Sequence, residues 1–446
     1  MTDQSHSDSH ATISHSGGPG ADLIDVIVVG GGLAGLVAAA TAARSGRRVV
    51  VLDPHPLGGR ARVDDRNGFR FNRGPRALYL GGAGRPILDS LGVDTSAGAS
   101  PAVPQSQGRH RGELRLLPQG PGSLIRTPLL RPAEKVRVGR LLTKFPKLDT
   151  KALAGTSFGA FLAAQNLSPT TADLVRMLAR VATYAAEPDA ADAGAVVGNM
   201  QLALAEGVRY LDGGFQALVD GVEASAVKAG VEFRTVAATS VQAGGGSAPP
   251  VVLTAQGPIS AASVVLATGT PAAAASLLGS PILRSEHLTA PVTAACLELG
   301  LRRPPRYPVV FGIGEPLYLS THCPPAKLAP PGHAVVHVMR NHAADEALEH
   351  HEQRAWLWAA AQQAGVTEDD IVEQRFLAEM VVTGGMPTAE GGGLLGRPAV
   401  SSPERPGILL AGDWVGPIGL LADASVSSGA AAGQHAMALA ATMAST

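Results

Sequence analysis

Short apolar runs separated by glycine- and alanine-rich segments mark the first part of the chain. Residues 25–29 end in four consecutive β-branched side chains, a pattern typical of a buried parallel strand. The alanine-rich segment 33–45, which Gly46 follows, predicts a helix. A second apolar run at 47–52 predicts a strand that ends at Asp53. Strand, helix and strand in this order predict a βαβ unit with two parallel strands.

Later apolar runs predict further strands. Residues 264–269 predict a buried strand that ends in an Ala-Thr-Gly turn, and residues 407–413 predict one that ends in Gly-Asp. Small residues from Ala424 onward predict a final helix. Residues 291–299 and 333–339 predict strands of a second, open sheet. The chain also predicts one or two helices over 157–185 and a turn between two strands at 243–247.

The chain is too long for one core of ordinary size. Its 446 residues suggest two or three structural units. Hydrophobic residues make up 45% and charged residues 16%, which is typical of a globular protein with a large core. The formal net charge of −1 gives no reason to expect a nucleic-acid partner, because neutralising phosphates requires clustered positive charge. No run of 18 apolar residues occurs, so no membrane-spanning helix is predicted.

The cysteines and the N-terminal tail bear on location. Cys296 and Cys323 form no CxxC pair and predict two reduced thiols in a cytoplasmic protein. Residues 1–21 are rich in Ser, His and Gly and lack the cationic start and apolar segment of a secretory signal, so we expect a disordered tail. A solvated tail is favoured over a metal site, although three histidines lie there: His6, His10 and His15.

The glycines after the first strand predict a dinucleotide site. Gly30 permits a tight turn, Gly32 lets a pyrophosphate approach the backbone, and Gly35 lets the helix pack closely on the strand. The helix N-terminus offers unpaired N–H groups to phosphates. Asp53 would accept hydrogen bonds from ribose hydroxyls and would repel a 2′-phosphate, which disfavours NADP. The predicted site residues here are Gly30, Gly32, Leu33, Ala34, Gly35 and Asp53.

The segment after Asp53 favours FAD. Gly58-Gly59-Arg60 follows closely, and here the chain resembles the flavin amine oxidase, protoporphyrinogen oxidase and phytoene desaturase superfamily. The resemblance implies that Arg60 lies near the FAD diphosphate, where a guanidinium can pair bidentately with phosphate oxygens. The alternative is an arginine on a surface loop.

Further segments extend the resemblance. Residues 68–75 are similar to a stretch whose Gly-Pro, here Gly74-Pro75, lies close to the flavin ring. The family's usual aspartate is Asn72 in this chain, which places a charged role there in doubt. Residues 210–215 resemble a turn that opens a helix in the same fold.

The most specific segment lies near the C-terminus. The resemblance implies that Gly412-Asp413 hydrogen-bonds the ribityl and diphosphate part of FAD, with the carboxylate facing hydroxyls or backbone N–H groups. The helix from Ala424 would point its positive end at the flavin ring.

The resemblance covers about 22–441 and implies an α/β fold, with an FAD-binding Rossmann-like domain of the glutathione reductase type and an inserted α+β substrate domain. The predicted divisions are a tail at 1–21, an FAD-binding domain at 22–100, 205–275 and 395–446, and a substrate domain at 101–204 and 276–394.

One charged segment is informative. Residues 109–151 contain eleven Lys and Arg but three acids, and leucine pairs and Phe145 are interleaved with them. Such a segment could rest on an anionic membrane surface and admit a lipid-like substrate. A solvated face of the substrate domain is the favoured alternative. Reversing the charge of Arg137, Arg140 and Lys144 would separate the two interpretations.

The resemblance implies non-covalent FAD that accepts a hydride at flavin N5 from a small apolar substrate, such as an isoprenoid or polyene, because the chain is most similar to phytoene desaturase-related proteins. No cysteine follows Cys323, so attachment of FAD to a C-terminal cysteine is excluded. One alternative is a flavin amine oxidase, although aromatic residues make up only 4% of the chain. The other alternative is a non-catalytic FAD-binding protein.

No catalytic side chain can be named from the sequence. Arg76 follows the Gly-Pro and could stabilise negative charge near the flavin or lie in an exposed loop. Tyr79 and Tyr318 are candidate pocket residues, but buried tyrosines usually only pack. Lys327 does not align with the lysine that many amine oxidases place near N5. Two histidines are expected on one face of a strand without a third metal ligand: His333 and His337.

Overall fold

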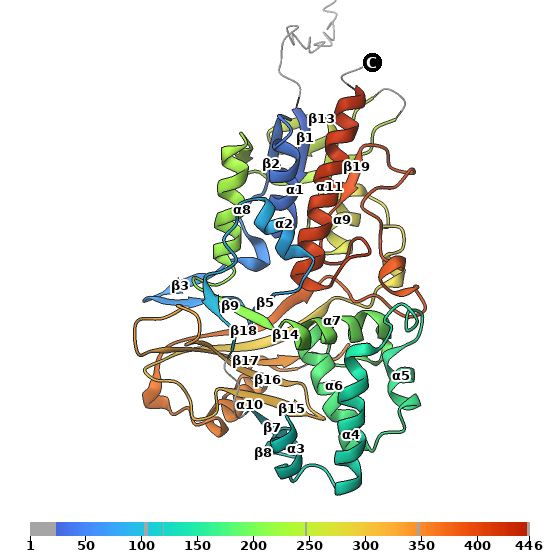
Figure 1. The fold of residues 1–446 in the computed structure, drawn as a ribbon. Coiled ribbons are helices and arrows are strands. Elements are labelled where there is room, and N and C mark those ends of the chain that lie inside the picture. The colour runs from blue at the N-terminus through green and yellow to red at the C-terminus, as the bar shows by residue number, and fades with distance from the viewer. Residues whose placement is uncertain are drawn as a thin grey trace, which may run out of the picture.

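The computed structural model describes residues 24–443 apart from 102–105, 119, 246–247, 345 and 347. The tail predicted at 1–21, with its three histidines, lies outside the described residues. Two large sheets lie at opposite ends of an elongated molecule (Figure 1). The first sheet takes three strands from the two ends of the chain and four from residues 232–266, and the second takes its strands from residues 107–116 and 292–383.

The first sheet has seven strands in the order β10-β2-β1-β13-β12-β11, and β19 pairs with β13. Its central pairs are parallel, as the β-branched, wholly buried runs predict. The strands are β1 (Ile24–Val29), β2 (Val49–Leu52), β10 (Glu232–Arg234), β11 (Ala238–Gln242), β12 (Val251–Thr254), β13 (Gly257–Leu266) and β19 (Ile408–Leu410).

Helices built largely from small residues cover this sheet. Helix α1 packs against both α8 and α11, so the first and last helices of the domain lie side by side (Figure 1). Alanine and glycine permit this close approach: a Cβ atom at Gly429 of α11 would lie 2.4 Å from the backbone oxygen of Ala34 in α1. The helices are α1 (Leu33–Ala43), α2 (Gly84–Ser90), α8 (Gln216–Lys228), α9 (Pro271–Leu278) and α11 (Leu421–Met443).

The second sheet also has seven strands, in the order β18-β14-β17-β16-β15-β7-β8. Alternate residues of β14 serve different purposes, as the two-residue period of a strand requires. Leu297 and Leu299 pack under helix α10 (His350–Gln363), whereas Cys296 and Glu298 face the opposite side. The strands are β7 (Gln107–His110), β8 (Glu113–Leu116), β14 (Val292–Leu301), β15 (Val309–Ile313), β16 (Leu317–Cys323), β17 (Ala334–Asn341) and β18 (Ile371–Thr383).

A layer of helices lies beside the second sheet (Figure 1). It comprises α3 (Pro121–Arg126), α4 (Pro132–Lys144), α5 (Phe158–Ala164), α6 (Pro169–Thr183) and α7 (Ala193–Ala205). Small sheets join the layers: β3 (Asp64–Arg66) with β4 (Phe69–Phe71), and β9 (Val208–Leu211) between β5 (Leu78–Tyr79) and β6 (Gly98–Ala99). Among the described residues, no helix is long and apolar enough to cross a membrane.

The predicted α/β fold with a Rossmann-like domain is confirmed, and two local predictions are corrected. The last helix begins at Leu421, one turn before Ala424, because Asp423 and its neighbours continue the helix in the N-terminal direction. His333 precedes β17, so it does not share a strand face with His337. Its ring lies instead edge-on to Phe69, with the centroids 5.6 Å apart.

Candidate functional site

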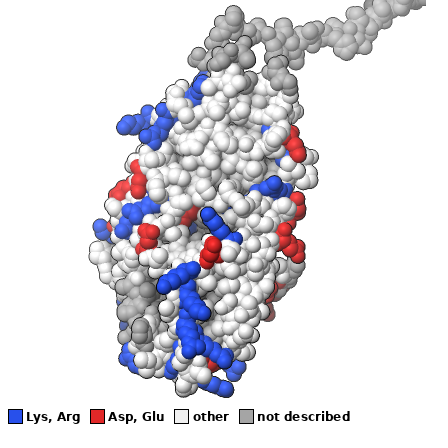
Figure 2. Space-filling view, turned by 45° about the vertical axis from the view of Figure 1, so that its right-hand side comes forward, with Lys and Arg blue, Asp and Glu red and all other residues white. Residues whose placement is uncertain are grey.

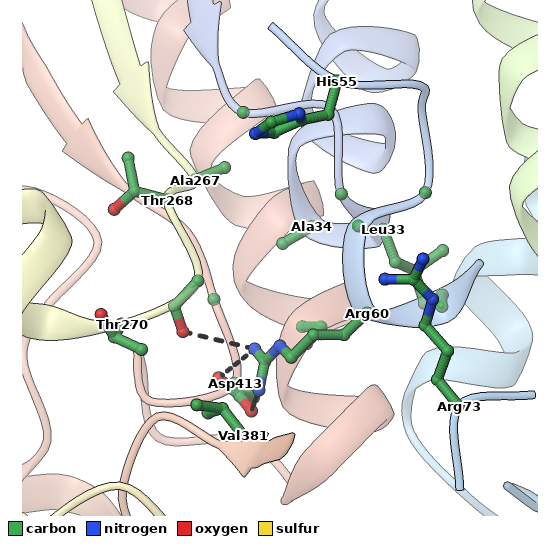
Figure 3. Close-up of a pocket in the computed structure, with 18 of the residues that line it drawn as sticks. Leu33, Ala34, His55, Arg60, Arg73, Ala267, Thr268, Thr270, Val381 and Asp413 are labelled. Atoms are coloured by element: carbon green, nitrogen blue, oxygen red, sulfur yellow. Dashed lines mark hydrogen bonds and ion pairs between the residues drawn. The ribbon is translucent and has the colours of Figure 1, made fainter. Parts of the chain in front are cut away.

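A cavity of about 840 Å³ lies at the carboxyl ends of the parallel strands of the first sheet. Ligands of open α/β sheets bind in the crevice outside these strand ends. Val29, Asp53 and Ala267, which end or follow β1, β2 and β13, all line the cavity. Figure 3 shows His55 at one end of the cavity and Asp413 at the other.

The three glycines of the predicted dinucleotide motif, Gly30, Gly32 and Gly35, differ in their surroundings. A Cβ atom at Gly30 would lie 2.4 Å from the oxygen of Ala267, and one at Gly35 would lie 1.9 Å from the oxygen of Gly30. These two glycines therefore hold helix α1 against the sheet. A Cβ atom at Gly32 would meet no described atom within 4 Å, because Gly32 faces the cavity. The structure thus leaves room for a ligand only at the middle glycine.

Asp53 has two backbone partners at the cavity wall. Its Oδ2 accepts a hydrogen bond from the Gly31 N–H at 2.7 Å, and its Oδ1 accepts one from the His55 N–H at 2.8 Å. Each carboxylate oxygen retains a further lone pair for a ribose hydroxyl. Ala238 and Leu277 add an apolar wall to the same cavity. This end combines the surfaces that a ribose and a flat base require.

Arg60 and Asp413 form an ion pair at the other end of the cavity (Figure 3). The guanidinium donates from Nη1 to Oδ2 at 2.9 Å and from Nη2 to Oδ1 at 3.0 Å. Nη1 also donates to the oxygen of Val382, and Nη2 to that of Gly269. Although burial by itself lowers the pKa of Arg60, the carboxylate of Asp413 raises it above the usual value.

This ion pair adds a partner that was not expected for Asp413. The carboxylate was expected to face hydroxyls or backbone N–H groups, but its main partner is the guanidinium of Arg60, with the Gly384 N–H at 3.3 Å. The two residues lie 353 positions apart, so local sequence could not show the pairing. Arg60 is therefore neither a free surface arginine nor an isolated phosphate ligand, because Asp413 fixes its orientation at the cavity.

A tight turn positions Arg76 between the two domains. Arg73 and Gly74 both have left-handed backbones, with φ of 55° and 87°. The Gly74 N–H donates to Oε1 of Glu298 at 2.6 Å, which anchors the turn to the second sheet. The buried Nε of Arg76 has no hydrogen-bond partner among the described residues. Burial and the nearby Arg60 lower the pKa of Arg76 to about 10, so it remains a cation at neutral pH.

The N-terminus of α11 completes the cavity. Leu421, Ala422 and Ser425 line it, whereas Ala424 is fully buried and points away. The helix starts one turn earlier than its small residues suggest, which brings a different set of residues to the wall. Gly412 belongs to the same wall, and its N–H donates to Oγ of Ser428 at 2.9 Å.

A second cavity of about 230 Å³ adjoins the first on the side of the second sheet. Four of the chain's five tyrosines line it. Burial raises the pKa of each of them, so all four hydroxyls are neutral. The low aromatic content of the whole chain therefore does not indicate that this pocket lacks aromatic side chains. These tyrosines are Tyr79, Tyr184, Tyr210 and Tyr318.

Five residues line both cavities, so the two share a wall. They are Arg76, Phe215, Val382, Leu421 and Ala422. Arg76 was left open between a flavin-proximal and an exposed position, and the structure places it at this wall. Gly74 lines neither cavity, and Pro75 lines the second.

A buried charged network in the second sheet supports the turn that carries Arg76. Glu298, which is fully buried, pairs with Arg375, and its Oε1 lies 3.2 Å from Nδ1 of His337. Burial by itself raises the pKa of Glu298, but His337, Arg375 and the Gly74 N–H together hold it below the usual value. The thiol of Cys296 lies within 4.8 Å of Glu298 and His337. His337 therefore has two neighbouring side chains of metal-ligating type, which the sequence did not reveal. The carboxylate of Glu298 already accepts hydrogen bonds from the Gly74 N–H and from Nε of Arg375, so we interpret the group as a charged network centred on Glu298.

The remaining sequence candidates lie away from both cavities. Lys327 is exposed, pairs with Asp212 and lines neither cavity. Cys296 and Cys323 form no disulfide, and both are buried. The side-chain oxygen of buried Asn72 accepts a hydrogen bond from the Phe215 N–H at 2.9 Å.

Comparison with known proteins supports the nucleotide-binding fold. The family model described as an NAD(P)-binding Rossmann-like domain matches residues 28–91. An all-trans-retinol 13,14-reductase from Macaca fascicularis is 34% identical over 130 residues, which are 28% of this chain and 20% of the relative. A coproporphyrinogen III oxidase from Propionibacterium freudenreichii subsp. freudenreichii is 32% identical over 167 residues, 34% of this chain and 30% of the relative. The chain thus matches less than a third of the length of either relative.

Solved structures are similar over almost the whole chain. An oxidoreductase from Methanosarcina mazei has a TM-score of 0.70 and 17% identity, and the match covers 92% of this chain and 99% of that one. A putrescine oxidase bound to putrescine has a TM-score of 0.69 and 17% identity, with 93% and 99% covered. These likenesses establish the fold, a Rossmann-like domain with an inserted second domain.

Proposed function

We propose that this protein binds FAD non-covalently in the first cavity and acts as an oxidoreductase on an apolar substrate in the second. The observation that carries the proposal is the shared wall of the two cavities, with Arg76 in it. A cofactor and a substrate held on either side of such a wall would touch each other. Bound FAD would supply the redox chemistry, by accepting a hydride from the substrate.

The residues of the first cavity fit FAD along its length. Asp53 and the apolar wall beside it suit the adenosine. Gly32 and the N-terminus of α1 suit the pyrophosphate, because the backbone is open there and the helix end attracts anions. Two buried polar atoms of lining residues have no protein partner among the described residues, Oγ1 of Thr268 and Nε of Arg76. Both would gain a partner from a bound dinucleotide.

This chain's own residues would orient the reacting ring. The N-terminus of α11 presents Leu421 and Ala422 at the shared wall, and its partial positive charge favours electron-rich atoms there. Arg76 adds a full positive charge on the same side. Together they would stabilise negative charge that develops on a cofactor during reduction. The closely packed tyrosines would exclude water from the wall.

The lining of the second cavity suits a neutral or anionic apolar substrate. Its walls are mainly aliphatic and aromatic, and no carboxylate lies among the described lining residues. A protonated amine would find no counter-ion, and Arg76 would repel it. We therefore favour an isoprenoid, polyene or similar substrate. That one partial relative is named for retinol agrees with this choice.

An amine oxidase activity is the second candidate. The rings of Tyr184 and Tyr318 lie 6.5 Å apart at an interplanar angle of 61°, and Phe311 stacks on Tyr318. Such an aromatic group could flank the amine of a neutral substrate. A non-catalytic FAD-binding protein is the third, because the first cavity fits FAD whether or not turnover occurs.

One experiment separates the three candidates. The purified protein should show the visible absorption of oxidised flavin and should release intact FAD on heating. Under anaerobic conditions, retinoids or longer polyenes should bleach that absorption and putrescine should not. Bleaching by putrescine alone would establish the amine oxidase, and FAD that no substrate bleaches would favour the non-catalytic protein. A colourless protein that cannot be reconstituted with FAD would overturn the proposal.

A further inference from the structure

Positive charge gathers on the helical layer although the whole chain is nearly neutral. Over residues 126–151 there are eight Lys and Arg and two acids. Figure 2 shows a stripe of basic side chains over the end of the molecule that bears α4. In the described chain, no carboxylate forms a salt bridge with any of these eight. They are Arg126, Arg131, Lys135, Arg137, Arg140, Lys144, Lys147 and Lys151.

Large apolar side chains are exposed among these cations. Ile125 at the end of α3 is 74% exposed, and Val136 and Leu142 of α4 are 56% and 43% exposed. Val138 anchors α4 to the rest of the protein, because it is buried in a cluster with Leu174 of α6. The outward side of α4 therefore combines uncovered apolar surface with unneutralised positive charge.

The structure narrows the segment that its sequence suggested. Arg109 is buried and pairs with Glu315 at 2.6 Å, and Arg115 pairs with Glu113, so Arg111 is the one exposed arginine of described residues 109–118 without a salt bridge. Phe145 is buried, whereas Leu142 is exposed. The surface lies on α3, α4 and the turn after them, and we name residues 121–151 the α3–α4 face.

We propose that the α3–α4 face docks on an anionic lipid surface. Interspersed apolar and cationic side chains are the combination that such a surface recognises, since apolar groups enter the interface while cations contact the headgroups. A nucleic acid would bind the cations through its phosphates but would leave the exposed apolar side chains without a partner. A protein partner would require carboxylates placed to match, whereas a lipid surface matches any arrangement of cations.

The mouth of the second cavity belongs to the same helical layer. Leu178 of α6 and Leu204 of α7 line that cavity and are 37% and 57% exposed. The side chain of Gln201 in α7 donates to the oxygens of Phe145 and Leu148, which lie directly after α4. A molecule docked through this layer would bring the cavity mouth near the lipid. The delivery of a lipid-dissolved substrate rests on the proposed function, but docking itself does not.

The test is sedimentation of the full-length protein with vesicles. Phosphatidylcholine vesicles that contain phosphatidylglycerol should bind the protein, and added salt should weaken the binding. Vesicles of phosphatidylcholine alone should bind it much less. Reversing the charge of Arg137, Arg140 and Lys144 to Glu should weaken binding at least about 100-fold, because each basic residue near an anionic surface contributes about fivefold.

Two further variants make the result specific. The control changes three exposed cations outside the α3–α4 face to Glu: Arg66, Lys228 and Arg354. This control has the same net charge as the charge-reversed α3–α4 variant but should bind like the wild type. Val136→Ser with Leu142→Ser should weaken binding about tenfold, and salt should not mask the loss. Equal binding by the charge-reversed α3–α4 variant and the control would overturn the proposal. Binding to duplex DNA with none to vesicles would overturn it too.

These outcomes are independent of turnover. A protein that docks on vesicles but bleaches with no substrate would refute the proposed function alone. A protein that oxidises a polyene in detergent but ignores vesicles would refute the docking alone.

Discussion

A single methyl group at Gly32 would test the cofactor site without disturbing the apoprotein. Gly32 has φ −74° and ψ 176°, an extended conformation that alanine adopts without strain. The new Cβ atom would meet no described atom within 4 Å, because it points into the first cavity. As Gly32 precedes α1 as its N-cap, alanine should destabilise the apoprotein by less than about 1 kcal/mol.

The loss of affinity follows from close packing. If the pyrophosphate lies against the backbone of Gly32, the methyl group must displace it. Overpacking of this kind costs about 1–3 kcal/mol, which weakens Kd about 5- to 150-fold. Gly32→Val, with two more carbon atoms, should abolish binding.

The matched control is Gly35→Ala, one turn further along the same helix. Its Cβ atom would lie 1.9 Å from the oxygen of Gly30 and 3.1 Å from the Cβ of Ala267, so backbone must move. This variant should destabilise the apoprotein by about 1–3 kcal/mol or more. The assays are thermal unfolding of the FAD-free proteins and titration of FAD fluorescence. Wild-type affinity in Gly32→Ala would refute the assignment of the pyrophosphate to this turn.

Three other substitutions test separate parts of the site. Asp53→Ala should weaken FAD binding by about 1–3 kcal/mol through lost ribose hydrogen bonds, whereas Asp53→Asn should retain more affinity in the same titration. Glu298→Gln should lower Tm, because it leaves Arg375 with a neutral buried partner, a change that can cost about 3 kcal/mol. An unchanged Tm would show that Asp64, the other partner of Arg375, suffices. Burial raises the pKa of Asp423 to about 6 from 3.8, although the Gly84 N–H opposes this. The folded state therefore binds more protons between these values and loses stability as pH rises through them. Asp423→Asn should be more stable than the wild type by on the order of 3 kcal/mol at pH 8, with the difference vanishing below about pH 4, as unfolding at each pH would show. An equal gain at both pH values would contradict this reasoning.

Features that depend on neighbouring residues could be predicted from the sequence. The βαβ unit at the N-terminus follows from a buried strand, three glycines and an alanine-rich helix that are contiguous in the chain. Gly35 has a local reason, since a Cβ atom there would meet the oxygen of Gly30, whereas a Cβ atom at Gly30 would meet Ala267 at the end of β13. The distinction between these two and Gly32 follows from spacing alone.

Features that depend on distant residues could not be predicted. The Arg60–Asp413 pair joins positions 353 residues apart, and nothing near either residue signals the other. The same applies to the tyrosines of the second cavity, which the small β5-β9-β6 sheet, the helical layer and the second sheet bring together. Composition averages over the chain, so 4% aromatic residues could not reveal that four tyrosines share one pocket.

Arg76 shows how these distant features combine at the wall that the two cavities share. Its place depends on the left-handed turn at Arg73 and Gly74, which is held by a carboxylate of the second sheet, Glu298. The turn therefore lies within the sequence of the first domain, but the hydrogen bond that anchors it comes from the second. Because burial and Arg60 already lower the pKa of Arg76, an anion from either cavity would be favoured. The positive charge of Arg76 would stabilise both a cofactor on one side and an apolar, electron-rich substrate on the other.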